Sequence, residues 1–158
     1  MTQKITANLW FDNQAEEAVD FYISLFDDAE VLNVLRYVEG GMGEVGKVMT
    51  ITFRLAGQVF TAINGGPEFQ FTEAVSFAID CGSQEEVDRY WELLTAEGEP
   101  GPCGWLKDKY GLSWQVVPRR LLELLHDPDQ RKVSRVTQAM LQMGKLDIAA
   151  LEAAYDAA

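Results

Sequence analysis

The chain repeats one pattern of strand and helix, and this repeat constrains its fold more than any other feature. Residues 4–26 and residues 73–94 each contain a short alternating strand, a polar helix start and an amphipathic helix. Glu17 and Tyr22 of the first helix correspond in position to Glu86 and Trp91 of the second, while the strands correspond with a slip of one residue. Self-similarity of this kind predicts two copies of one supersecondary unit, with a functional site between the copies.

Charge and composition exclude several classes of partner. The chain has 158 residues, of which 13 are basic and 25 acidic, so its net charge near −12 repels phosphate backbones and anionic lipid surfaces. No apolar run reaches the roughly 20 residues that span a bilayer, and the first residues lack the features of a signal peptide. We therefore expect a cytoplasmic protein that binds neither nucleic acid nor membrane. Cys81 and Cys103 are expected to be reduced thiols.

The first copy predicts the order strand, helix, strand, strand, strand. Alternation from Ile5 to Phe11 indicates a strand, and Asn13 with Glu16 forms the pattern of a capping box before a helix that ends near Phe26. Three further strands are expected, separated by glycine-rich turns. They span residues 29–39, 47–56 and 58–64.

The second copy predicts the same order and is followed by a helical tail. Alternation at Val75, Phe77 and Ile79 indicates the strand, and Ser83 with Glu86 repeats the capping box. Short strands follow Gly98 and the turn at residues 110–111. Three helices are then expected, over residues 119–126, from a cap at Asp127 to Gly144, and from a cap at Asp147 to Tyr155. The tail carries an apolar stripe of Val133, Val136, Met140 and Met143.

These features resemble the vicinal oxygen chelate superfamily, which has the glyoxalase and bleomycin resistance fold. The stretches LWFDNQAEEAVDFY (9–22), FTAINGGPEFQF (60–71), CGWLKDKYGLSWQVVP (103–118) and VTQAMLQMGKLDIAALEAAY (136–155) are similar to its PhnB-like branch. Proteins of this branch often carry the name 3-demethylubiquinone-9 3-methyltransferase. The residues do not support that activity, because no glycine-rich loop follows a strand in a parallel α/β pattern, where it could seat a nucleotide cofactor.

The resemblance implies an α+β fold of two β-α-β-β-β modules that form a cup, plus a helical C-terminal extension. We expect a glyoxalase-like domain over residues 1–118, divided into modules 1–66 and 67–118, and an extension over residues 119–158. Members of the superfamily pair or swap their modules, so a homodimer is also expected.

The superfamily usually holds a divalent metal in the cup with four ligands from the first and last strands of each module. In this chain the last-strand positions are Thr61 and Gln115. The first-strand positions fall near Ile5 or Ala7 and near Val75 or Ser76. None of these is His, Asp or Glu, the electron-rich side chains that such a metal needs. We therefore predict no metal site and no cofactor. The single histidine, His126, lies in the tail and is interpreted as a helix-terminal residue.

Without a metal, the groups that can bind a ligand in the cup are aromatic rings and amide side chains. The predicted ligand-binding residues are Thr61, Asn64, Ser76, Cys103, Trp105 and Gln115. Strand alternation places Thr61 and Gln115 on the cup face of their strands and Phe60 and Trp114 on the opposite face. Cys103 lies near Lys107 and Lys109 in the sequence, and positive charge lowers the pKa of a thiol, so a reactive cysteine is one alternative.

The sequence predicts a metal-free protein that binds a small molecule in an aromatic and amide-lined cup. Two alternatives stay open. One is an enzyme that acts on a small carbonyl or aromatic substrate, with a metal or through Cys103, and the other is the methyltransferase of the family name. Whether the protein is an enzyme, and which ligand it takes, is left open by the sequence.

Overall fold

The structure, a computed structural model, describes residues 3–158, and the chain divides into two compact units. The first unit extends to Phe71 and the second comprises Thr72–Ala158, so the helical tail belongs to the second unit. Each unit is described separately below. Within residues 3–158, no helix has both the length and the apolar character needed to cross a membrane.

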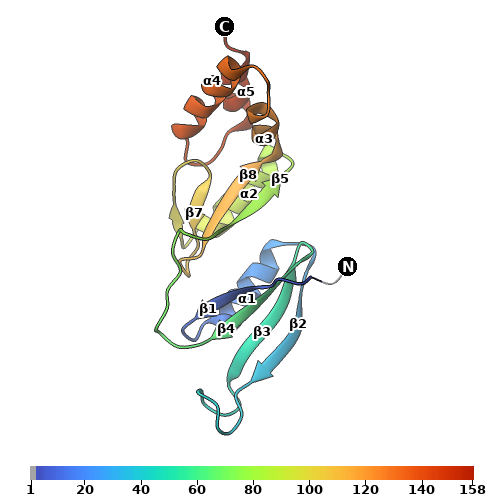
Figure 1. The fold of residues 1–158 in the computed structure, drawn as a ribbon, viewed down its shortest axis with the longest axis vertical. Coiled ribbons are helices and arrows are strands. Elements are labelled where there is room, and N and C mark those ends of the chain that lie inside the picture. The colour runs from blue at the N-terminus through green and yellow to red at the C-terminus, as the bar shows by residue number, and fades with distance from the viewer. Residues whose placement is uncertain (1–2) are drawn as a thin grey trace. The chain divides into compact units, whose positions relative to one another are not determined.

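The first unit has the strand and helix order expected from the repeat (Figure 1). It comprises β1 (Ala7–Phe11), α1 (Ala15–Leu25), β2 (Ala29–Arg36), β3 (Val48–Leu55) and β4 (Gln58–Asn64). The sheet order is β1-β4-β3-β2, in which β1 runs parallel to β4 and the other pairs are antiparallel. The first and last strands of the unit therefore lie side by side.

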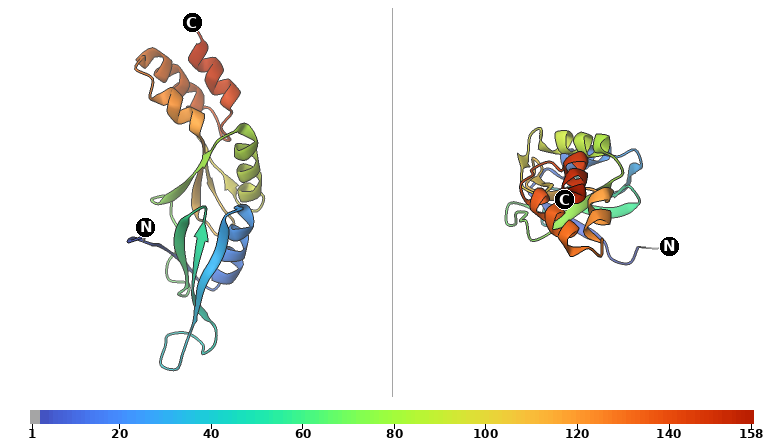
Figure 2. Two further views of the ribbon diagram at one scale, coloured as in Figure 1. Left: turned by 90° about the vertical axis from the view of Figure 1, so that its right-hand side faces the viewer. Right: turned by 90° about the horizontal axis from the view of Figure 1, so that it is seen from above.

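Helix α1 covers one face of this sheet (Figure 2). Its apolar side chains Ala18, Val19, Tyr22 and Leu25 are buried at helical spacing. The Tyr22 ring stacks on Phe53 of β3, with centroids 6.4 Å apart, and Phe53 stacks in turn on Phe60 of β4. This aromatic stack lies in the core of the unit. Within residues 3–71, no helix of the unit covers the other face of the sheet.

The start of α1 differs from the predicted capping box. The residue at the N-cap position is Gln14, which makes no side-chain cap bond, and Asn13 does not cap the helix. Instead, Oδ1 of Asn64 at the end of β4 accepts a 2.8 Å hydrogen bond from the backbone N–H of Ala15. The expected local cap is wrong because a distant side chain occupies its place.

The second unit repeats the topology of the first. It comprises β5 (Ser76–Cys81), α2 (Gln84–Thr95), β6 (Glu99–Pro100), β7 (Trp105–Lys107) and β8 (Ser113–Pro118), in the sheet order β5-β8-β7-β6. Here the predicted cap is confirmed, since Oγ of Ser83 accepts from the N–H of Glu86 at 3.2 Å. Gly111 has a φ of 84°, a conformation that favours glycine, and it forms the tight turn into β8.

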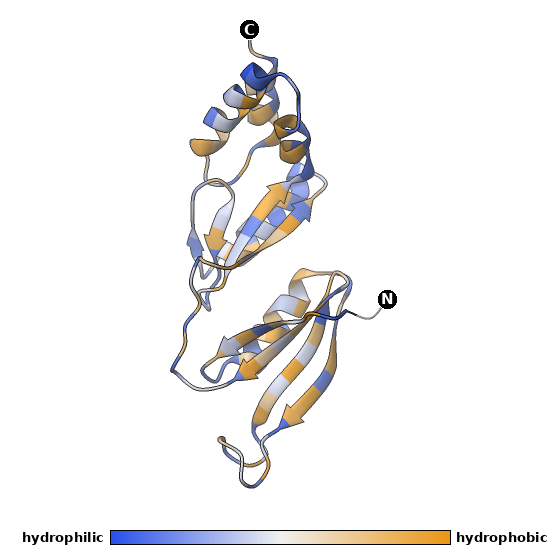
Figure 3. Ribbon diagram, viewed as in Figure 1, coloured by the Kyte–Doolittle hydropathy of each residue, from blue (hydrophilic) through white to orange (hydrophobic). Residues whose placement is uncertain are grey.

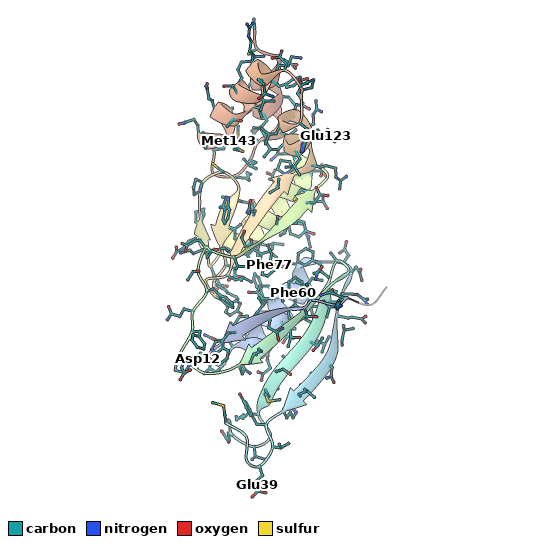
Figure 4. All side chains as sticks on the ribbon, viewed as in Figure 1. Asp12, Glu39, Phe60, Phe77, Glu123 and Met143 are labelled. Carbon is teal, nitrogen blue, oxygen red and sulfur yellow. The ribbon has the colours of Figure 1, made fainter. Side chains whose placement is uncertain are left out.

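The tail forms a small helical core of its own within the second unit. It comprises α3 (Arg119–Leu125), α4 (Gln130–Leu141) and α5 (Ile148–Asp156). Five buried residues form the core, and the apolar faces of the helices are coloured orange in Figure 3. These core residues are Leu121, Leu124, Val136, Leu146 and Leu151. Met140 and Met143 of the predicted stripe pack against this core, and Met143 lies just after α4 (Figure 4).

The cap of α4 lies two residues later than predicted. Asp129, not Asp127, holds the first turn by accepting from the N–H of Arg131 at 2.9 Å. Asp127 instead accepts from the N–H of Asp129 at 2.7 Å and from the Tyr155 hydroxyl at 2.6 Å. A side chain that bonds its own backbone two residues on forms a turn, so the helix starts after it. The predicted cap of α5 at Asp147 is confirmed by its bond to Ala150.

Candidate ligand-binding site

The alternation of β8 determines which of its side chains face the helix and which face away. Trp114 and Val116 are buried on the side of α2, which contacts β8. Successive side chains of a strand point to opposite faces, so Gln115 and Val117 lie on the other face. Val117 accordingly packs against the tail core. The predicted register of Trp114 and Gln115 is therefore the one that the structure has.

This second face carries a cavity of about 390 Å³ between the sheet and the tail helices. Three predicted site residues, Cys103, Trp105 and Gln115, line it together. The sheet also contributes Ala78, Asp80 and Val117, and the tail contributes Leu121, Leu122, Leu125, Met140 and Leu146. The structure thus brings half of the predicted set to one cavity within a single unit.

Gln115 is oriented by a fourth predicted residue. Its Nε2 donates a 2.9 Å hydrogen bond to Oγ of Ser76, which lies on the neighbouring strand β5. Within residues 3–158, the Gln115 carbonyl oxygen and its second N–H have no protein partner. The amide therefore has one fixed bond to the protein, and it keeps one acceptor and one donor for a ligand.

Trp105 and Cys103 form the wall next to this amide. Trp105 of β7 lies directly opposite Gln115 of β8 in the antiparallel pair, so the ring and the amide are cross-strand neighbours. Cys103 has a φ of 57°, and its backbone N–H donates to the carbonyl of Met143 at 2.7 Å. The loop that carries Cys103 is thus tied to the segment that follows α4.

The two cysteines differ in their surroundings. Both are free thiols. Cys81, the last residue of β5, is buried, and this burial raises the pKa of its thiol to about 12. Cys103 is only partly buried and lines the cavity. The lysines near it in the sequence pair with glutamates instead, Lys107 with Glu73 at 2.5 Å and Lys109 with Glu97 at 3.8 Å.

A second cavity of about 460 Å³ lies beside the first and shares Cys103 and Trp105 with it. Its polar lining includes Glu73, Glu99, Lys107 and Ser113. The bond from Lys107 holds the pKa of the Glu73 carboxyl below its ordinary value. The Ser113 hydroxyl is buried and has no hydrogen-bond partner among residues 3–158. The sequence pattern gives no sign of this, because a serine is an ordinary residue at that position of a strand.

The remaining predicted residues, Thr61 and Asn64, lie in the first unit and face opposite ways. Thr61 is on the face without a helix, opposite Thr52 of β3, and the two hydroxyls are 3.4 Å apart. Asn64 is on the helix-covered face, where its Nδ2 donates to Oε1 of Glu16 at 2.7 Å and to the carbonyl of Val48 at 3.1 Å. Asn64 also accepts the cap bond from Ala15, so its side-chain amide is fully used within the first unit. Asn64 and Thr61 therefore point to opposite faces of the sheet. Convergence of Thr61 and Gln115 on one cavity stays a prediction.

The residues at the expected metal positions do not fit a divalent cation. Thr61 and Gln115 present a hydroxyl and an amide, which carry no negative charge. In the described part of the chain, no three His, Cys, Asp or Glu side chains gather as a metal site requires. The metal-free state itself stays a prediction.

The repeated β-α-β-β-β units, each with its first and last strands paired in parallel, define a protein of the glyoxalase and bleomycin resistance superfamily. More narrowly, the family model described as 3-demethylubiquinone-9 3-methyltransferase matches residues 3–117, and the chain belongs to this family. The search of curated proteins found no match.

Solved structures agree with this assignment. The PhnB protein from Bacillus cereus, which carries the same methyltransferase name, is 41% identical, with 73% of this chain and 99% of that chain covered and a TM-score of 0.66. A protein from Pseudomonas aeruginosa is 17% identical over 74% of this chain and 98% of its own, with a TM-score of 0.63. The fosfomycin resistance protein FosX from Listeria monocytogenes is 18% identical over 75% and 93%, with a TM-score of 0.50. The last two show the fold alone.

Proposed function

We propose that this protein binds a small molecule, without a metal ion, in the 390 Å³ cavity between the sheet of the second unit and the tail helices. The observation that carries the proposal is that Cys103, Trp105 and Gln115 line this one cavity. A largely apolar cavity with a few oriented polar groups is the usual form of a ligand site. Trp105 offers a flat apolar surface, and the Gln115 amide, held by Ser76, offers a donor and an acceptor.

The binding test uses N-phenylnaphthylamine, a neutral aromatic amine whose fluorescence rises in apolar surroundings. The wild-type protein should bind the probe, and Gln115→Ala should weaken binding by about 1 to 3 kcal/mol because a buried polar group of the probe loses its partner. Gln142→Ala is the control, since Gln142 is exposed at the end of α4 and lies outside the cavity. No binding by the wild-type protein, or equal binding by both variants, contradicts the proposal.

The metal-free part of the proposal has its own test. Protein purified without added metal should contain well under one equivalent of transition metal by elemental analysis. A chelator should leave Tm unchanged, because removing a ligand lowers stability only when the folded protein binds it. Stoichiometric metal that disappears in Gln115→Ala would contradict this reading and would identify Gln115 as a ligand.

The family name supports a second candidate, a methyltransferase. Such an enzyme needs a methyl donor, so calorimetric titration with S-adenosylmethionine separates the candidates. The binding proposal expects no heat of binding from this titration. Saturable binding would favour the methyltransferase.

The partly exposed thiol of Cys103 supports a third candidate, an enzyme for small carbonyl or aromatic substrates. Thiol chemistry would make Cys103 the nucleophile. The binding proposal expects no turnover of small aldehydes by the wild-type protein. Turnover of an aldehyde panel that is lost in Cys103→Ser would favour the enzyme.

We also propose that the protein acts as a cytoplasmic homodimer. Strand β2 supports self-association, because it is the edge strand of its sheet and exposes Val31, Leu32, Val34 and Leu35 by 41 to 48%. Its apolar colouring is visible in Figure 3. Light scattering should give twice the chain mass, and Val34→Lys should reduce it. The free thiols are in keeping with a reducing compartment.

A further inference from the structure

The tail helices lie outside the residues that the family model matches. The family model ends at residue 117, and α3 begins at Arg119. The Bacillus cereus chain aligns over 99% of its length but with only 73% of this chain. About a quarter of this chain therefore has no counterpart in that relative, and the tail accounts for a segment of this size.

We infer that the tail helices form one wall of the ligand cavity and restrict it to neutral, largely apolar molecules, an inference that rests on the proposed binding function. Leu121 and Leu125 of α3, Met140 of α4 and Leu146 before α5 line the cavity opposite the sheet. A ligand that contacts Gln115 would therefore also contact side chains that the family model does not include.

Hydrogen bonds to α2 and to the Cys103 loop hold this wall in place. The Gln84 side chain at the start of α2 accepts from the N–H of Ile148 at 2.8 Å and donates to the carbonyl of Leu146 at 3.1 Å. The carbonyls of Met143 and Gly144 accept from the N–H groups of Cys103 and Gly104. The segment from Met143 to Ile148 thus supports both the tail wall and the Cys103 loop.

The chemistry of the lining indicates the class of ligand. Every tail residue in the cavity is a leucine or a methionine. Asp80, which is the charged residue of the lining within residues 3–158, is paired with Arg119. Nη2 of Arg119 lies 2.6 Å and its Nε lies 3.1 Å from Oδ2 of Asp80. Among the residues that the structure describes, no unpaired cation or anion therefore lines the cavity, and Gln115 supplies the polar contact. A neutral aromatic or aliphatic molecule with one hydroxyl or amine group fits this lining.

The test compares two neighbouring tryptophan substitutions in α4. Met140→Trp should fill part of the cavity, whereas Leu141→Trp places the same ring at a position that is 57% exposed and outside the lining. Met140→Trp should weaken binding of N-phenylnaphthylamine by about tenfold or more, which corresponds to about 1.4 kcal/mol. Leu141→Trp should bind it as the wild type does. Circular dichroism and thermal unfolding establish that both variants fold.

A second variant covers the case in which Met140→Trp does not fold. Leu122 lines the cavity and is 46% exposed, so Leu122→Trp narrows the opening at little risk to the core. It should also weaken probe binding. Anilinonaphthalene sulfonate, which resembles the neutral probe but carries a negative charge, should bind the wild type at least about tenfold more weakly than the neutral probe.

The outcomes separate the two proposals. Probe binding that falls in Gln115→Ala but is unchanged in Met140→Trp and Leu122→Trp overturns the role of the tail and leaves the binding function standing. Sulfonate binding as tight as that of the neutral probe overturns the stated ligand class. Failure of the wild type to bind either probe overturns both the function and the tail inference.

Discussion

The indole Nε1 of Trp114 donates a 2.9 Å hydrogen bond to Oδ2 of Asp108, and both side chains are buried. The other carboxylate oxygen, Oδ1, accepts from the backbone N–H groups of Tyr110 and Leu112. One buried carboxylate therefore joins the turn before β8 to the core under α2. Because Gln115 follows Trp114 directly, this bond also sets which residue of β8 faces the cavity.

Trp114→Phe should lower the free energy of unfolding by about 1 to 3 kcal/mol, because the buried Asp108 carboxylate loses one of its donors. Trp91→Phe is the matched control, since the Trp91 indole N–H makes no hydrogen bond in the part of the chain that the structure describes. Chemical denaturation followed by circular dichroism measures both. Equal losses of unfolding free energy in the two variants would show that Trp114 stabilises the fold through ring packing alone.

Asn64→Ala should destabilise the first unit by about 1 to 3 kcal/mol, because Asn64 caps α1 and bonds Glu16 and Val48. Asn13→Ala should change stability little, since Asn13 makes no cap bond. Urea unfolding of the two variants tests this difference. A larger loss of stability in Asn13→Ala than in Asn64→Ala would contradict this assignment and favour Asn13 as the cap of α1.

Ser113→Ala should raise the free energy of unfolding by about 1 kcal/mol, because it removes a buried hydroxyl that has no hydrogen-bond partner in the described part of the chain. Ser83→Ala should have the opposite sign and cost about 1 kcal/mol, because Ser83 caps α2. Thermal unfolding of the wild type and the two variants measures the sign of each stability change. Loss of stability in Ser113→Ala would mean that the hydroxyl is hydrogen-bonded in solution.

Tyr155→Phe should raise the pKa of Asp127. The Tyr155 hydroxyl is the main cause that holds the Asp127 pKa below its ordinary value, followed by the bond from the N–H of Asp129. A carboxyl whose pKa is lower in the folded state stabilises the fold above its unfolded pKa of about 4, and this contribution disappears as the pH falls through the folded pKa.

The wild type should therefore lose stability between pH values of about 5 and 2, and Tyr155→Phe should lose less over that range. An NMR titration of the Asp127 carboxyl measures the shift directly. An Asp127 pKa that is the same in both proteins would contradict the assigned cause.

The sequence by itself determined the features that depend on local periodicity. Alternation in β8 assigned Trp114 and Gln115 to opposite faces, and the capping patterns at Ser83 and Asp147 located the starts of α2 and α5. These succeed because a strand or helix imposes its period on neighbouring residues and a local cap needs only residues three apart.

Only the tertiary structure decided the features that join distant segments. Asn64 caps a helix 49 residues earlier in the chain, which displaced the role predicted for Asn13 and set Asn64 apart from Thr61. Leu121, Leu125 and Met140 form a cavity with Trp105 and Gln115, although nothing in the apolar stripe says which surface it covers. An apolar side chain gains nearly the same free energy against any partner, so its sequence period predicts burial, while the packing of the chain determines the partner.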